Sequence, residues 1–216
     1  MYNLKTLPDR ISLFPLSNAL LLPHSRLPLN VFEPRYLSML DDTMRSDHRL
    51  IGMIQPLAPD HVSGAPRVHQ IGCAGRLTSF SETSDGRYMI TLTGISRFRV
   101  ANLIDGFLSY QTADVNWDSF SGDLSSPSDD LSFDREKFLI VLERYFKTME
   151  LSTDWDSLKD ADDLLLINSL AMLCPFEPEE KQALLEAPSL LTRRETLLTL
   201  MEFALREESG TMGKVQ

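Results

Sequence analysis

The sequence has few residues that could cross-link the chain. Its only cysteines are Cys73 and Cys174. Neither lies in a Cys-x-x-Cys motif, which argues against a disulfide framework and against a zinc ribbon. Two isolated thiols fit a reducing cytosol, and a chain of 216 residues can bury a sizeable core without cross-links. We therefore expect a globular cytoplasmic protein.

Basic residues are also in short supply. The chain has 21 Lys and Arg against 31 Asp and Glu, a net charge of −10. Nucleic acids and anionic lipids are held by clustered cations, so this balance argues against both as partners. Apolar runs are too short to span a bilayer. The apolar residues 11–16 are interrupted by Pro15 and are too few for a secretory signal.

The first half of the sequence consists of short apolar runs cut by Pro, Gly and Ser. Strands are expected at 11–16, 26–32 and 50–55. Pro34 is typical of a first helical position, where its missing N–H costs nothing. A short helix from there to about Arg45 is expected.

The clearest local signal is a hairpin followed by a second turn. Asp85-Gly86 and Asp105-Gly106 supply residues that tolerate the positive φ of tight turns. A meander with one apolar face must close on itself or be covered, which predicts a small barrel or curled sheet. The strands expected around these turns are 71–82, 87–94, 95–104 and 107–117.

The second half has helical periodicity. About four helices are expected, beginning with a face of Phe138, Leu142 and Tyr145. Acidic residues before 164–173 and Pro178 before the next apolar run indicate helix starts. Thr192 to Glu195 fits a capping box. The expected domains are a β-rich barrel at 1–118, a linker at 119–133, a helical bundle at 134–208 and a flexible tail at 209–216.

Candidate catalytic motifs are weak. His24 and Ser25 are adjacent, and adjacent residues on an extended chain point apart, so a turn explains them better than a nucleophile and base. The tail 210–215 contains Gly-Lys but no following Ser or Thr. It also lacks the strand and helix that a phosphate loop needs.

Candidate metal ligands are equally sparse. His61, His69 and Cys73 lie close in sequence without zinc-site spacing. A loop histidine and a buried thiol explain them more simply, so no metal and no cofactor are expected.

The order of the apolar segments along the first half of the chain, together with parts of the second half, resembles the Lon protease N-terminal domain family. The similarity covers about residues 9 to 206. It is carried by Leu13-Phe14-Pro15-Leu16, Leu21-Leu22-Pro23, Leu27-Pro28-Leu29, Phe32-Glu33-Pro34-Arg35-Tyr36, Ile51-Gly52, Gly72-Cys73-Ala74-Gly75, Leu92 to Phe98, Leu170-Ala171 and Pro178 to Glu186.

This resemblance implies an α+β fold: a PUA-like curled antiparallel β-barrel followed by an α-helical bundle, as in stand-alone bacterial members. The ATPase and peptidase domains of full-length Lon are not in this sequence, nor is a Walker A motif or a Ser-Lys peptidase segment. The hypothesis is a non-enzymatic module that binds unfolded or tagged polypeptide segments, as an adaptor to a protease or chaperone.

The polypeptide surface is predicted from arginine and aromatic residues of the barrel half. Two alternatives stay open: a small hydrolase with an unrecognised site, and an RNA-binding barrel. The second requires Arg76, Arg87, Arg97 and Arg99 to form one basic patch. The predicted surface residues are Phe32, Arg35, Tyr36, Phe80, Tyr88 and Phe98.

Overall fold

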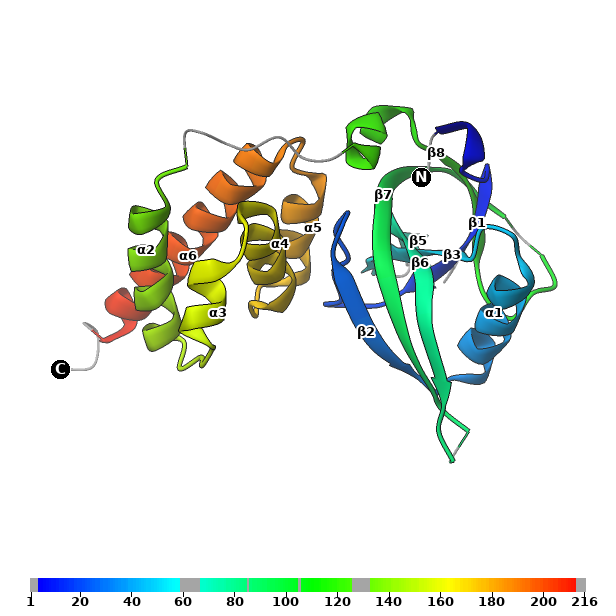
Figure 1. Cartoon of the computed structure of the whole chain (residues 1–216), viewed down its shortest axis with the longest axis horizontal. Coiled ribbons are helices and arrows are strands. Elements are labelled where there is room, and N and C mark those ends of the chain that lie inside the picture. The colour runs from blue at the N-terminus through cyan, green and yellow to red at the C-terminus, as the bar shows by residue number, and fades with distance from the viewer. Residues whose placement is uncertain (1–3, 59–66, 85, 105, 126–132, 213–216) are drawn as a thin grey trace. The chain divides into compact units, whose positions relative to one another are not determined.

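The computed structural model describes residues 4–58, 67–84, 86–104, 106–125 and 133–212 (Figure 1). Parts of three predicted features lie outside these ranges: Asp85 and Asp105 of the two turns, and His61. The chain forms two compact units. One is Met1–Ser126 with Phe176–Leu185, and the other is Pro127–Pro175 with Glu186–Gln216.

The first unit is built on a six-stranded sheet with the order β2-β7-β6-β3-β1-β8. The long β7 also pairs with β8, and this pairing closes the sheet into a barrel. The predicted α+β fold with a β-barrel is thereby confirmed. The strands are β1 (Arg10–Pro15), β2 (Arg26–Val31), β3 (Leu50–Ile54), β6 (Ile71–Glu82), β7 (Tyr88–Ile104) and β8 (Thr112–Asn116).

Shorter elements complete this unit. Helix α1 begins at Pro34 and ends at Arg45, as the sequence predicted. Strands β4 and β5 form a separate two-stranded ribbon, and the segment expected to be linker begins with a 3-10 helix instead. The remaining elements are η1 (Leu4–Thr6), β4 (Pro56–Leu57), β5 (Arg67–Val68), η2 (Asp118–Leu124) and α5 (Pro178–Glu186).

Two strand predictions need correction. The barrel was expected to be antiparallel, but β1 and β3 pair in parallel, with α1 in the connection that brings the chain back. The last strand was expected from residue 107, but its ladder begins at Thr112. Residues 107–110 are bends, in which Phe107 and Leu108 are exposed and Tyr110 is buried. An apolar pattern alone does not distinguish such a segment from a strand.

The barrel interior is a continuous apolar core. The side chain of Phe98 is fully buried there, with its ring centroid 5.9 Å from that of Trp117. Members of this cluster come from nearly every barrel strand, so the core depends on all of them being paired. They are Leu7, Ile11, Leu13, Leu50, Ile54, Ala74, Phe98, Ala113, Val115 and Trp117.

Helix α5 clusters with the barrel, although the sequence placed it in the helical bundle. Buried polar side chains attach it to barrel backbone. Lys181 Nζ donates to the Asn18 carbonyl at 2.8 Å, and Gln182 Nε2 donates to the Ile71 carbonyl at 3.1 Å. The helix pattern predicted α5 itself correctly, but polar residues give no apolar signal of such packing.

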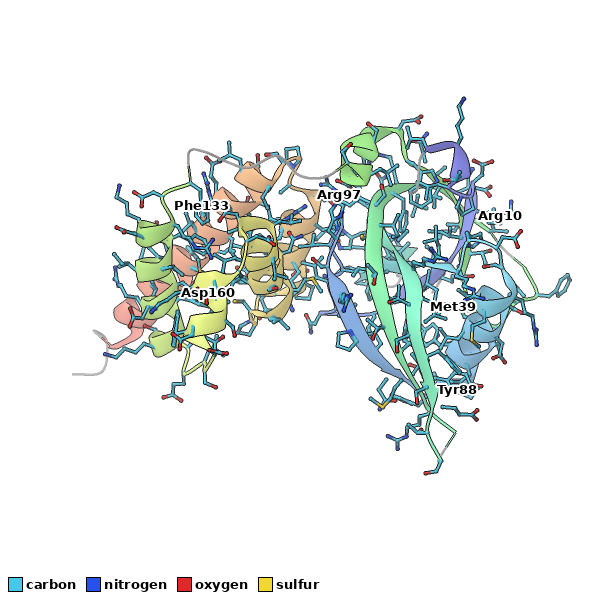
Figure 2. The ribbon with its side chains drawn as sticks, viewed as in Figure 1. Arg10, Met39, Tyr88, Arg97, Phe133 and Asp160 are labelled. Carbon is cyan, nitrogen blue, oxygen red and sulfur yellow. The ribbon has the colours of Figure 1, made fainter. Side chains whose placement is uncertain are left out.

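A buried ion pair joins β7, η2 and α5. The Arg97 guanidinium, labelled in Figure 2, donates from Nε and Nη2 to the two carboxylate oxygens of Asp123 at 2.8 and 2.7 Å. Its Nη1 donates to the Leu185 carbonyl at 3.1 Å, and its Cζ lies 4.7 Å from the centre of the Phe120 ring. Arg97 is 4% exposed, and two stretches of chain, η2 and the end of α5, supply the partners of this buried cation.

The turn at His24 is bound to β7 through the backbone. His24 has a φ of 65°, and its N–H donates to the Gly94 carbonyl at 2.9 Å. The Gly94 N–H donates to the Ser25 carbonyl at 2.8 Å. A Cβ at Gly94 would lie 2.0 Å from the Leu22 carbonyl oxygen, so this turn can approach β7 only because position 94 is glycine.

The second unit is helical. Asp134, Asp154 and Asp162 cap three of its helices by accepting backbone N–H groups. Arg135 Nη2 donates to the Ala161 carbonyl at 2.6 Å, and its Nη1 donates to Asp163 at 2.6 Å. The helices are α2 (Arg135–Thr148), α3 (Trp155–Asp160), α4 (Asp163–Leu173) and α6 (Leu190–Met212).

Three details of this unit differ from expectation. The short helix α3 was not predicted. The capping box at Thr192 is wrong, because α6 begins earlier and the Ser189 hydroxyl accepts the Thr192 N–H at 3.1 Å. The backbone of α6 continues to Met212, where a flexible tail was expected from residue 209. The last residues, 213–216, lie outside the described ranges.

Replacing Arg97 with Met should lower the free energy of unfolding by about 3–5 kcal/mol, because the Asp123 carboxylate is left buried without its partner. Chemical denaturation measures this. Adding Asp123→Leu should recover part of the loss. The exposed pair of Arg10 and Asp114 supplies the control, since Arg10→Met should change stability little. If Arg97→Met and Arg10→Met lower the free energy of unfolding equally, the buried pair is no more important than the exposed one.

Replacing Gly94 with Ala should lower the free energy of unfolding by at least about 1–3 kcal/mol, the usual cost of overpacking. The atom it would strike is backbone, which cannot rotate away. Gly122→Ala is the matched control, because nothing lies within 4 Å of a Cβ there. A parent-like melting temperature for Gly94→Ala would contradict the close approach.

Candidate functional site

The best candidate binding site on the barrel unit is a groove of about 720 Å³. It is walled by the end of β1, the start of α1, the β4–β5 ribbon, the end of β7 and the segment leading into β8. We call it the barrel groove. Its lining residues are Pro15, Arg35, Tyr36, Pro56, Leu57, Arg67, Val68, Leu103, Ile104, Gly106, Leu108, Ser109, Tyr110, Gln111 and Thr112.

The rim of the barrel groove is apolar and exposed. Leu108 is 53% exposed and Leu103 is 39% exposed, and both line the groove. Phe107, next to Leu108 in the chain, is fully exposed. Apolar side chains gathered beside a concave surface are typical of a place where another molecule packs.

The floor of the groove is fixed by Tyr110. Its hydroxyl donates to the Asp42 carboxylate on α1 at 2.7 Å. Burial, with the hydrogen bond to Asp42 as the next cause, raises the pKa of Tyr110 to about 12. The phenol therefore stays neutral at physiological pH and keeps this bond between the β8 approach and α1 intact.

The charged side chains among the described lining residues are Arg35 and Arg67, both cationic. Arg35 Nη2 lies 2.8 Å from the Glu33 carboxylate, and its Cζ lies 4.6 Å from the centre of the Tyr36 ring. The described lining includes no carboxylate, histidine or cysteine.

The structure brings together two of the six predicted surface residues here. Arg35 and Tyr36 sit at the start of α1 and line the barrel groove. Tyr36 is nevertheless 5% exposed and packs on Phe14, with ring centroids 4.3 Å apart. Burial raises its pKa. It acts mainly as an anchor of α1, and only its edge reaches the groove.

The other four predicted residues lie elsewhere. Phe80 and Tyr88 face each other across the β6–β7 hairpin, with ring centroids 4.7 Å apart, and Figure 2 labels Tyr88 toward the hairpin tip. Phe32 is 63% exposed just after β2. The prediction that Phe98 lies on the surface is wrong. Phe98 is fully buried, because its face of the strand points into the barrel core.

The sequence pattern did not predict most of the residues that line the groove. Leu57 and Arg67 meet only through the β4–β5 pairing, for which strands of two residues give no pattern. Leu103 and Leu108 lie on either side of the turn that the sequence predicted at Asp105-Gly106. Apolar residues on both sides of a turn were a usable signal, but residues 107–110 were assigned to a strand.

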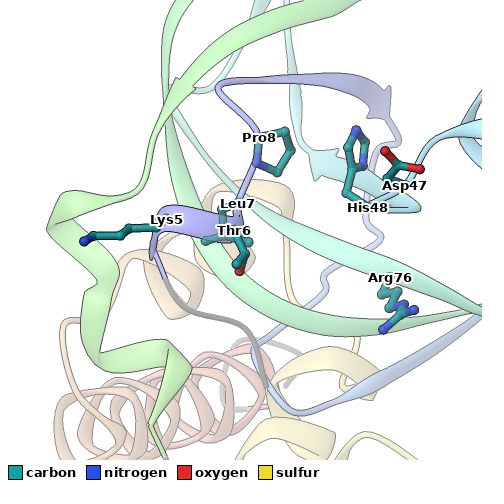
Figure 3. Close-up of a pocket in the computed structure, with 7 residues that line it drawn as sticks. All are labelled: Lys5, Thr6, Leu7, Pro8, Asp47, His48 and Arg76. Atoms are coloured by element: carbon teal, nitrogen blue, oxygen red, sulfur yellow. The ribbon is translucent and has the colours of Figure 1, made fainter.

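A second pocket of about 440 Å³ lies between η1, β6 and the segment after α1. Figure 3 shows that Lys5 extends away from His48 and Asp47, so its charged groups do not converge on one point. His48 Nδ1 accepts the Leu50 N–H at 3.0 Å. Burial lowers the pKa of His48, against the opposing effect of Asp47. This histidine therefore organises the approach to β3.

The condition for an RNA-binding barrel is not met. Arg97 is buried and paired with Asp123, so it cannot join Arg76, Arg87 and Arg99 in one basic patch. Within the described ranges, no cluster of three or more metal-ligating side chains occurs. The same part of the chain includes no helix that is both long and apolar enough to cross a bilayer.

Comparison with known proteins agrees with this architecture. Residues 10–202 match the model of the ATP-dependent protease La (LON) substrate-binding domain. The N-terminal domain protein of Lon from Xanthomonas campestris superposes with a TM-score of 0.59 at 25% identity, covering 88% of this chain and 97% of that one. The N-terminal domain of Lon from Mycobacterium avium complex superposes at 0.62 with 13% identity, covering 89% and 98%.

Curated relatives are much longer. The Lon protease of Escherichia coli K12 is 25% identical over 206 residues, which is 89% of this chain and 24% of that protein. For Lon protease 2 of Sorangium cellulosum the matched share is 12% of the relative. The chain therefore spans a quarter or less of the length of these two relatives.

The described chain thus combines a closed barrel, which carries a groove, with a helical unit joined to it in sequence. The chain belongs to the Lon substrate-binding domain family, since the family model covers most of it. The match is to the non-catalytic, N-terminal part of Lon.

The stability of the barrel should depend on pH through His48. The folded form holds His48 neutral, whereas the unfolded chain binds a proton near pH 6.5. The stability contributed is thus present above about pH 6.5 and is lost as pH falls through the lower folded pKa. His48→Asn keeps an acceptor for the Leu50 N–H and does not titrate. Its unfolding free energy should fall less steeply than the parent's between about pH 7 and pH 5. If the unfolding free energies of the parent and of His48→Asn change equally with pH, His48 does not cause the pH dependence.

Proposed function

We propose that this chain binds unfolded or tagged polypeptide segments in the barrel groove. The observation that carries the proposal is the exposed apolar rim beside a concave lining without an acid–base pair among its described residues. An extended segment can bury apolar side chains against Leu103 and Leu108. Burying apolar surface contributes about 25 cal/mol per Å², so a few such contacts give useful affinity. The family membership supports this choice of ligand.

The proposal extends to the role of the module. Polypeptide binding without a catalytic group fits an adaptor or chaperone-like factor in protein quality control, working in the cytoplasm and handing segments to a separate protease or chaperone. No cofactor is needed for this role. The acidic chain, with a net charge of −10, also disfavours nucleic acid as a competing partner.

A peptide-binding experiment tests the groove. Fluorescence anisotropy with apolar, unfolded-protein peptides should show binding by the parent protein. Leu103→Ser and Leu108→Ser should each weaken it about 5- to 30-fold, because each removes an apolar contact worth roughly 1–2 kcal/mol. Both side chains are exposed, so the fold should survive the change, which thermal unfolding verifies.

Two further variants make the test specific. Met89→Ser alters an equally exposed apolar residue, at 56%, outside the groove and should leave binding unchanged. Phe80→Ser probes the hairpin surface predicted from sequence. A loss of affinity at Phe80 but not at Leu103 or Leu108 would move the binding site to the hairpin. If the parent protein binds none of the peptides, the proposal of polypeptide binding is rejected.

A further inference from the structure

The charged side chains among the described residues that line the barrel groove are cationic, although the chain is acidic. The chain as a whole has a net charge of −10, yet the charged side chains among the described lining residues are Arg35 and Arg67. A molecule this acidic repels anions generally. A pair of arginines among otherwise uncharged described lining residues therefore attracts carboxylates locally, within a Debye length of about 8–10 Å.

Arg67 is placed beside an apolar contact. In the β4–β5 ribbon it lies directly opposite Leu57, and opposite residues of an antiparallel pair project from the same face with Cβ atoms about 5 Å apart. Both residues line the groove. A ligand that packs an apolar side chain on Leu57 brings its neighbouring groups within reach of the Arg67 guanidinium.

The other cation sits at a helix start. Arg35 lies in the first turn of α1, where Glu33 provides no side-chain cap. The partial positive charge of the α1 N-terminus therefore adds to that of the guanidinium. Arg35 is already paired with Glu33, and both partners are about half exposed. A ligand carboxylate there competes with Glu33, so Arg67 is expected to contribute more.

We infer that the barrel groove selects apolar polypeptide segments that carry an acidic residue, with Arg67 and secondarily Arg35 as the groups that hold the carboxylate. This inference rests on the proposed function and defines its substrate class. A guanidinium can donate two parallel hydrogen bonds to one carboxylate, and Arg67 is exposed and therefore accessible to a ligand. The groove then selects a polypeptide segment by the charge of one of its residues rather than by a long sequence motif.

The test uses three short apolar peptides that differ only at a central Glu, Gln or Lys, with both ends blocked to remove terminal charges. Anisotropy titrations with the full chain should give an order of affinity of Glu, then Gln, then Lys. The Glu peptide should bind about 1.5- to 5-fold more tightly than the Gln peptide, as expected for an exposed ion pair. Higher salt should reduce this preference.

Charge-removing variants locate the effect. Arg67→Met should abolish most of the preference for the Glu peptide over the Gln peptide. Arg26→Met is the matched control, because Arg26 is an exposed arginine on β2 that does not line the groove. It should keep the full preference. Loss of preference in both variants would overturn the inference in favour of non-specific attraction.

The inference and the proposed function fail in different ways. If Glu and Gln peptides bind equally, and Leu108→Ser weakens both, the groove binds polypeptide without charge selection and only the inference falls. If no peptide binds the parent protein, both fall. If the Lys peptide binds most tightly, the sign assigned to the groove is wrong.

Discussion

The buried guanidinium of Arg97 is the interaction on which the barrel unit depends. It binds Asp123 and the Leu185 carbonyl, which lie 26 and 88 positions away in the chain. A buried cation is costly unless its hydrogen bonds are satisfied, and here the partners come from η2 and the end of α5. The strand, the 3-10 helix and the last helix of the unit must therefore be in place together. This explains why α5 clusters with the barrel despite its position in the helical half of the sequence.

The same strand connects this ion pair to the barrel groove. From Arg97, β7 continues through its pairing with β8 to Leu103 and Ile104, which line the groove. The ladder changes register between Val100 and Asn102, and such a bulge bends a strand and redirects its side chains. The groove wall is thus set by a strand that the buried ion pair holds at one point and the barrel closure holds at another. Tyr110 adds the bond from the β8 approach to α1.

Local signals predicted the elements well, and non-local contacts explain what was missed. Helix α1 and the β6–β7 hairpin follow from Pro34, from the turn ending in Gly86 and from alternating apolar residues, all of which act within a few positions. The parallel pairing of β1 with β3 and the attachment of α5 have no such signal. Of the predicted site, Arg35 and Tyr36 do line the groove. Leu57 and Arg67 could not be found, because strands of two residues carry no periodicity.

Charge also explains how one groove can be selective on so acidic a molecule. A polyanion such as RNA presents charge along its whole length and meets the net charge of −10 over a wide surface, so two arginines cannot compensate for the repulsion. A single carboxylate within an apolar segment interacts only over a Debye length and senses mainly the groove. The inferred role of Arg35 and Arg67 in holding one acidic residue is therefore compatible with the net charge of −10, which disfavours a polyanion as partner. Under this arrangement, discrimination among polypeptide segments depends on the charge of one side chain next to apolar side chains. An unfolded chain exposes both kinds of side chain.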